Sequence, residues 1–186
     1  LNSAANTAGS GFGGSGEVTQ GTAATTISED GSYTGETYTS TGDDENALRI
    51  DGATVTLDGI TVDKSDGASS NTEDGDFYGQ NAALLATNGA NVTLSNATIT
   101  SSVANGNGVF SYGTGTVVTV SDSTINTTGN NSGGIQTTGG GTTYANNLTV
   151  TTAGNSAAAI RSDRGGGTVV VDGGSYATAG TGSPAI

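Results

Sequence analysis

The sequence predicts an all-β fold: a single-stranded parallel β-helix, or solenoid, of about six coils of ~25 residues each. Three observations predict it. A strand-like phrase recurs at a nearly fixed spacing, apolar and polar residues alternate within each copy, and Gly, Asn and Asp separate the copies. Short alternating runs bounded by such residues are typical of strands, and no stretch keeps the 3.6-residue apolar period of a helix.

The recurring phrase sets the predicted coil length. It reads VTLDGITVD, VTLSNATIT, VTVSDSTIN, TYANNLTVT and VVVDGGSYA, beginning at Val55, Val92, Val118, Thr143 and Val169. These starts are 37, 26, 25 and 26 residues apart, and an earlier copy, GSYTGETYT, begins 24 residues before Val55. The longest spacing is one period plus an insertion of about 11 residues, within residues 65–80. A hairpin-based sandwich or barrel would have no fixed period, so the spacing favours stacked coils.

Each copy predicts an apolar column that faces the core and a polar column that faces water. The predicted inward positions include Leu57, Leu94 and Val120, followed after a corner by Val62, Ile99 and Ile125. The corners read DG, SN, SD, NN and DG, residue types that tolerate the left-handed backbone of a sharp bend. A further strand is predicted upstream in each unit, at residues 46–50, 81–85, 107–112, 132–137, 156–161 and 183–186.

The predicted domain organisation is simple. Residues 1–22, which contain GFGGSG, are expected to be a flexible lead-in or an N-terminal cap, and residues 23–186 form the β-helix with the inserted loop 65–80. Both ends of a solenoid present unpaired strand edges, so end-to-end self-association is expected unless the ends are capped.

Composition excludes several functional classes. The formal net charge is -13, which disfavours nucleic acids and anionic membranes as partners. No apolar run is long enough to cross a membrane in this segment. The chain has no Cys and no His, so thiol nucleophiles, His-based triads and thiolate metal sites are absent.

Two longer phrases carry a resemblance to a known family. GETYTSTGDDENALRIDGATVTLDGITV and GANVTLSNATITSS resemble the repeats of large secreted bacterial adhesin-like proteins that have pectate-lyase-like right-handed β-helices. The similarity covers about residues 31–186. It implies a right-handed coil, a secreted or cell-surface location on a bacterium, and a chain that is often one part of a much longer protein.

The outward threonines are one candidate functional surface. At one position of successive coils the sequence places Thr37, Thr61, Thr98, Thr124 and Thr149. A flat threonine array at strand and coil spacing resembles, in part, the surface of ice-binding β-solenoids. Threonine also favours strands and pairs well along a sheet, so a structural ladder explains the same pattern.

The inserted loop is the second candidate. Its Phe77 and Tyr78 are aromatic side chains suited to stacking on a sugar ring, with Asp76 and Glu73 beside them, although the rings would equally pack back on the solenoid. Asp74 and Asp76 are weak candidates for a Ca²⁺ site, because the spacing of a calcium-binding loop is not present. A solvated acidic loop explains these carboxylates equally well, and no cofactor is expected.

An enzyme is the less favoured alternative. Pectate-lyase-like enzymes use an Arg or Lys beside Ca²⁺-binding carboxylates, and this chain has only four basic residues: Arg49, Lys64, Arg161 and Arg164. A β-helix glycoside hydrolase needs two carboxylates across a cleft. The sequence therefore predicts a non-catalytic adhesin or stalk segment whose partner is a glycan or a surface, with a polysaccharide lyase or hydrolase and an ice-binding solenoid as alternatives.

Overall fold

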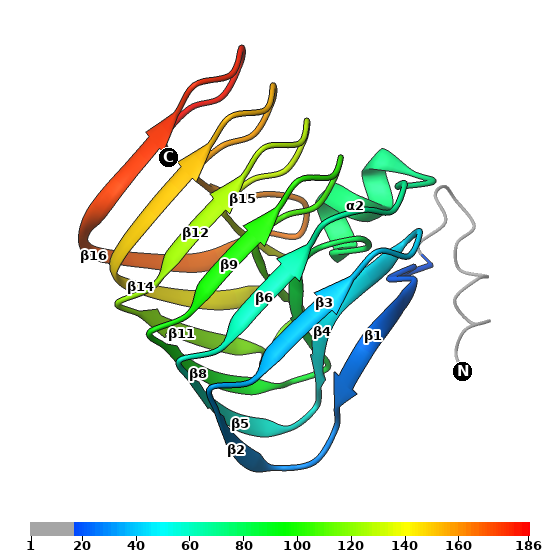
Figure 1. The fold of residues 1–186 in the computed structure, drawn as a ribbon, viewed down its shortest axis with the longest axis vertical. Helices are drawn as coiled ribbons and strands as arrows, with labels where there is room; N and C mark the ends of the chain where they lie inside the picture. The colour runs from blue at the N-terminus through cyan, green and yellow to red at the C-terminus, as the bar shows by residue number, and fades with distance from the viewer. Residues whose placement is uncertain (1–16) are drawn as a thin grey trace.

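The computed structural model describes residues 17–186, which form a parallel β-solenoid of about six turns with about 26 residues per turn. Figure 1 shows the coils stacked one on another from the N-terminal to the C-terminal side. The predicted fold class is confirmed. Most of the predicted lead-in, residues 1–16, lies outside the described residues.

Each coil contributes three strand segments, so the solenoid has three rows of strands. The first row contains β1 (Thr22–Ile27), β4 (Glu45–Asp51), β7 (Leu84–Thr87), β10 (Val109–Tyr112), β13 (Ile135–Thr138) and β15 (Ile160–Ser162). The second row contains β2 (Gly31–Thr34), β5 (Thr54–Asp58), β8 (Asn91–Ser95), β11 (Val117–Ser121) and the first halves of β14 (Gly141–Thr152) and β16 (Gly167–Thr178). The third row contains β3 (Thr37–Ser40), β6 (Thr61–Lys64), β9 (Thr98–Ser101), β12 (Thr124–Thr127) and the second halves of β14 and β16.

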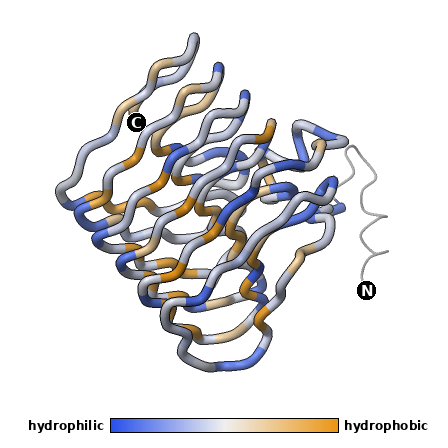
Figure 2. The backbone as a smooth tube through the Cα atoms, viewed as in Figure 1, coloured by the Kyte–Doolittle hydropathy of each residue, from blue (hydrophilic) through white to orange (hydrophobic). Residues whose placement is uncertain are grey.

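The predicted alignment of the repeats is the observed register. Val92 pairs with Val118, and Ile99 pairs with Ile125, in parallel strands. These four side chains are fully buried, as are their counterparts Leu94 and Val120. Figure 2 shows apolar segments recurring at equivalent places in successive coils. Burying each large side chain of such a column contributes about 1.5–3 kcal/mol.

The bend between the second and third rows has the expected backbone. Its second residue has a φ between 52° and 69° in every coil, and the residues concerned are Gly35, Gly59, Asn96, Asp122, Asn147 and Gly173. Only Gly, Asn and Asp occupy this position because they adopt the left-handed conformation at low cost.

Four strands of the first row, β7, β10, β13 and β15, begin later than predicted, whereas β4 begins at Glu45, one residue earlier. β7 starts at Leu84 rather than 81, and β10 at Val109 rather than 107. Just before β10 and β13 the backbone lies close against core side chains: a Cβ on Gly108 would lie 2.5 Å from Ile125 Cγ2, and one on Gly134 would lie 2.3 Å from Val150 Cγ1. Residues 183–186 form no strand, although the Pro184 carbonyl accepts from the Ala159 amide.

The insertion after β6 is only partly a loop. Residues Thr72–Tyr78 form the short helix α2, which lies at the side of the stack in Figure 1. The expectation of an irregular loop over 65–80 is corrected at these seven residues.

Candidate functional site

The α2 helix is defined by its two caps. The Asn71 side chain accepts a hydrogen bond from the Asp74 amide at 3.0 Å, which satisfies one of the free amides of the first turn. Gly79 ends the helix with φ 84°. A Cβ on Gly79 would lie 2.6 Å from Leu85 Cδ1, so glycine also allows the chain to rest directly on the solenoid. Residues 71–79 are called the α2 strap below.

The strap lies over a small apolar cluster on the outer side of the first row. Ala82, Leu85 and Phe110 are fully buried there, and Tyr112 packs against them. Within the helix, a Cβ on Gly75 would lie 2.7 Å from Asn105 Cβ, so the glycine permits close approach. The strap therefore covers apolar surface that would otherwise face water.

Side chains from distant parts of the chain hold the strap in place. Gln136 Nε2 donates to the Asp76 carbonyl at 2.9 Å, and Thr138 Oγ1 donates to the Phe77 carbonyl at 2.6 Å. From the N-terminal part of the solenoid, Gln20 Nε2 donates to the Tyr78 carbonyl at 3.0 Å and Asn46 Nδ2 donates to the Gly79 carbonyl at 3.0 Å. One short segment is thus bonded to residues that belong to the first, second and fifth coils.

The two aromatic side chains that were candidates for sugar binding both contact the protein itself. The Phe77 ring lies 4.0 Å from the Arg164 guanidinium carbon, and Tyr78 meets Tyr112 edge to face at 5.6 Å between ring centres. Both residues are half-buried. The structure thus uses at least one side of each ring for packing, and the Arg164 that lies over Phe77 also pairs with Glu73 at 3.8 Å.

The carboxylates of the strap differ in exposure. Glu73 is exposed, whereas Asp74 and Asp76 are half-buried. Asp76 Oδ1 accepts from Asn105 Nδ2 at 3.1 Å. Over residues 17–186 no group of three or more carboxylates is arranged to hold a metal ion, so the structure does not bring Asp74 and Asp76 together into a Ca²⁺ site.

Burial changes the acidity of these groups. Desolvation raises the pKa of Asp76 to about 6, while nearby Arg161 and the Asn105 hydrogen bond act in the opposite direction. Burial, with the charges of Glu73 and Asp44, also raises the pKa of Asp74. Asp76 is therefore a carboxyl group that changes charge under mildly acidic conditions.

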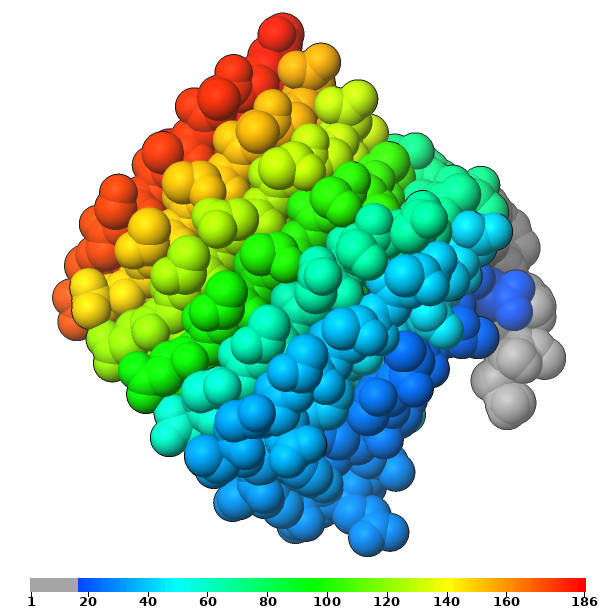
Figure 3. Space-filling model, in the orientation of Figure 1, coloured from blue at the N-terminus to red at the C-terminus, as the bar shows by residue number. Residues whose placement is uncertain are grey.

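The outward threonines form the expected ladder. Thr37, Thr61, Thr98, Thr124 and Thr149 are register partners in successive strands of the third row, and Ser175 continues the column. Within the described part of the chain their hydroxyls have no side-chain hydrogen bond. Figure 3 looks onto this side of the molecule, where the coils lie as parallel bands. The surface they form is called the threonine face below.

The neighbouring outward column behaves differently. It contains Thr39, Asp63, Thr100, Asn126, Thr151 and Ala177. Thr100 Oγ1 donates to Asp63 at 2.9 Å, and Thr151 Oγ1 donates to Asn126. Two of the three threonine hydroxyls here bind side chains of the adjacent coil, so this column is partly stabilised by bonds within the protein.

Each of the four basic residues contacts another part of the protein. Lys64 is fully buried, with Nζ 3.0 Å from Ser40 Oγ and 2.6 Å from the Gly42 carbonyl, and burial lowers its pKa despite the carboxylates around it. Arg161 pairs with Asp163. Arg49 donates to the Gln20 carbonyl at 2.7 Å.

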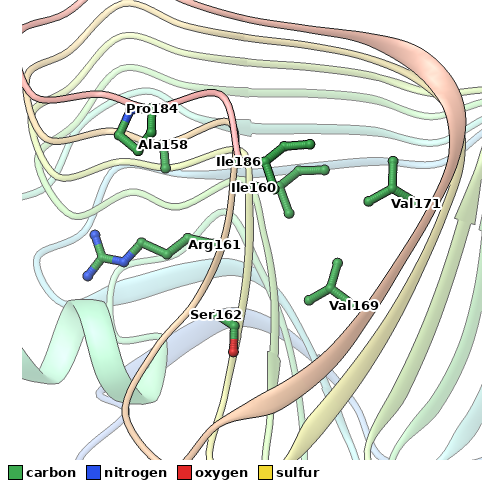
Figure 4. Close-up of a pocket in the computed structure, with 8 residues that line it drawn as sticks. All are labelled: Ala158, Ile160, Arg161, Ser162, Val169, Val171, Pro184 and Ile186. Atoms are coloured by element: carbon green, nitrogen blue, oxygen red, sulfur yellow. The ribbon is translucent and has the colours of Figure 1, made fainter.

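An apolar pocket opens at the last described coil. Ile160, Val169, Val171 and Ile186 line it, together with Pro184 and other residues (Figure 4). Figure 4 shows Arg161 pointing away from these apolar side chains, on the other side of its strand. Val169 and Val171 continue the inward columns of Thr143 and Ala145, so the pocket is a part of the core that no described coil covers.

Sequence reasoning did not identify the residues that hold the strap. Asn105 lies in the turn between β9 and β10, and Gln136 and Thr138 lie in β13; nothing in their local sequence links them to residues 71–79. The one available signal was NTEDGDFYG, in which a capping residue and a terminal glycine flank a short segment.

Comparisons with known proteins identify no relative. No family model matches the chain, and neither a curated protein nor a solved structure shows significant similarity to it. Among residues 17–186, no helix has the length and apolar character that a membrane crossing requires.

Proposed function

We propose that this chain is a non-catalytic segment of a secreted or surface-attached bacterial adhesin or stalk. The solenoid is a rigid support, and its partners, with glycans as the expected class, contact the surface of the α2 strap. The resemblance of the repeats to adhesin-like proteins motivates the proposal, and the geometry of the solenoid supports it.

One observation carries the proposal. The residues that a polysaccharide-cleaving enzyme would need are already bound to other parts of the protein. Lys64 lies in the core, Arg161 pairs with Asp163, and Arg164 lies over the Phe77 ring. An Arg or Lys that acts on a substrate has to contact it, whereas Lys64 is fully buried and the guanidinium groups of Arg161 and Arg164 already contact Asp163 and the Phe77 ring.

A binding screen and a cleavage screen together test the proposal. The protein is applied to a glycan array, and it is separately incubated with polysaccharides and Ca²⁺ while unsaturated and reducing ends are measured. We expect glycan binding without cleavage, with binding weakened at least tenfold in Phe77→Ala and unchanged in Thr98→Ala, a substitution on the threonine face. Cleavage that disappears in Arg161→Ala would instead identify an enzyme.

The threonine face supports a second function, adsorption to ice. Five threonines in register have hydroxyls with no side-chain hydrogen bond among the described residues, and successive coils repeat about every 4.7–4.9 Å. Such an array can order water in two dimensions. The adjacent column is interrupted by Asp63, Asn126 and Ala177, which limits the regular area.

Thermal hysteresis measurements distinguish this second function from the first. If the threonine face adsorbs to ice, the protein depresses the freezing point below the melting point, and Thr98→Tyr abolishes the gap. Thr93→Tyr is the matched control because Thr93 is also exposed, in β8 of the same coil, but lies outside the threonine face. Absence of hysteresis in the unmodified protein would end this proposal and leave the first unaffected.

A further inference from the structure

The α2 strap connects parts of the solenoid that otherwise contact only their neighbours. Its carbonyls accept hydrogen bonds from Gln20 in the N-terminal segment and from Gln136 and Thr138 in β13. Its side chains reach Arg164, which follows β15. In a plain solenoid each coil binds only the coils directly above and below it, so the strap adds contacts that the repeat itself does not provide.

The inner side of the strap contains one ionisable group at its centre. Asp76 lies between the helix and the coils, where Asn105 Nδ2 donates to its carboxylate at 3.1 Å and to the Thr72 carbonyl at 3.4 Å. The adjacent Gly75 carbonyl accepts from Asn107 Nδ2 at 3.4 Å. A charge on Asp76 is therefore partly enclosed when the strap is closed and becomes fully exposed to water if the strap lifts away.

We propose that the α2 strap is a proton-sensitive clasp, which closes more tightly on the coils when Asp76 takes up a proton. The apolar cluster under the strap and the hydrogen bonds to its carbonyls hold it closed at neutral pH. Protonation removes the enclosed charge and strengthens the same closed arrangement.

The direction of this pH effect follows from the pKa of Asp76 in the closed and in the open strap. Closed, its pKa is about 6; open, it takes its ordinary value of 3.8. The closed form therefore binds the proton more tightly, so closing becomes more favourable as the pH falls from about 7 towards 4. When the pH falls from 7.5 to 5, these two pKa values correspond to an increase of about tenfold in the equilibrium constant for closing the strap.

The charged groups around Asp76 have opposing effects on its protonation, and therefore on closing of the strap. Arg161 favours the ionised carboxylate and Asp163 the protonated one, and these two residues are themselves paired. On the helix, the pKa of Asp74 is also raised, so this group acts in the same direction as Asp76. Glu73 is exposed and pairs with Arg164 at 3.8 Å.

Hydrogen exchange of the strap tests the proposal. The amides of Gly75 and Gln80, which donate to the Asn71 and Asp74 carbonyls, report on α2. The Val120 amide in the core is the internal reference. After correction for intrinsic exchange rates, we expect protection of the two strap amides to be up to about tenfold greater at pH 5 than at pH 7.5, with the reference unchanged.

Two variants separate Asp76 from the general charge of the helix. Asp76→Asn is expected to lose more than half of the pH dependence, and Glu73→Gln, which removes one exposed charge from the same helix, to keep it. Equal protection at both pH values, or equal loss in both variants, would overturn the proposal. Carboxyl NMR titration of the unmodified protein needs no variant, and an Asp76 pKa near 3.8 would overturn it as well.

Discussion

Two outer surfaces of this solenoid are built in opposite ways. The threonine face repeats one small side chain per coil and is left uncovered, whereas the outer side of the first row contains Leu85 and Phe110 and is covered by the α2 strap. The uncovered surface comes directly from the repeat. The covered surface depends on a single insertion and on polar residues that do not recur from coil to coil. The repeat therefore determines the solenoid, and the insertion adds the α2 strap.

The largest effect is expected at the centre of the covered surface. Phe110→Ala should lower the free energy of unfolding by about 3–4 kcal/mol, because it removes a fully buried ring and leaves a cavity beneath the strap. Thr124→Ala, on the threonine face of the same coil, should change it by less than about 0.5 kcal/mol. Urea denaturation of both variants checks the contrast, and similar losses in the two would contradict it.

An intermediate effect is expected at the helix cap. Asn71→Ala removes the side chain that accepts from the Asp74 amide and should destabilise α2 by about 1 kcal/mol. Because the change is confined to the strap, hydrogen exchange should become faster there and remain unchanged at Ile99 and Ile125. Equal acceleration in the core would mean that the strap and the coils open together.

The smallest effect distinguishes the two outward columns of one strand. Thr100 donates to Asp63, and Thr98 has no side-chain partner among the described residues. Thr100→Val should therefore cost about 0.5–1 kcal/mol, and Thr98→Val less than about 0.5 kcal/mol. Urea denaturation under identical conditions compares the two variants. A larger loss of unfolding free energy in Thr98→Val would show that Thr98 makes a stabilising interaction within the protein.

The sequence predicted the repeat well because the signal is local and recurs. Val92 and Val118 occupy equivalent places in similar phrases, and Asn96 and Asp122 occupy the same bend. Each copy therefore supports the same predicted strands and bend in the other copies. The register and the left-handed corners follow from that alone.

The strap could not be predicted in the same way. TEDGDFY has an internal glycine and two aspartates, so its intrinsic helix propensity is low. The helix depends on its caps and on contacts with residues as distant as Thr138, which occur once and have no counterpart in other coils. The burial of Lys64 was also not evident, because its column carries a hydroxyl residue in the coils on both sides, Ser40 and Ser101.

Bonds between residues 71–79 and sites as far apart as Gln20 and Arg164 have a mechanical consequence. A plain stack of coils pulled at one end would peel apart one coil at a time, at low and nearly constant force. With the strap in place, the first coils cannot separate until several of its contacts are loaded in shear. Single-molecule stretching of this rod should therefore begin with one high rupture peak, followed by a series of smaller ones.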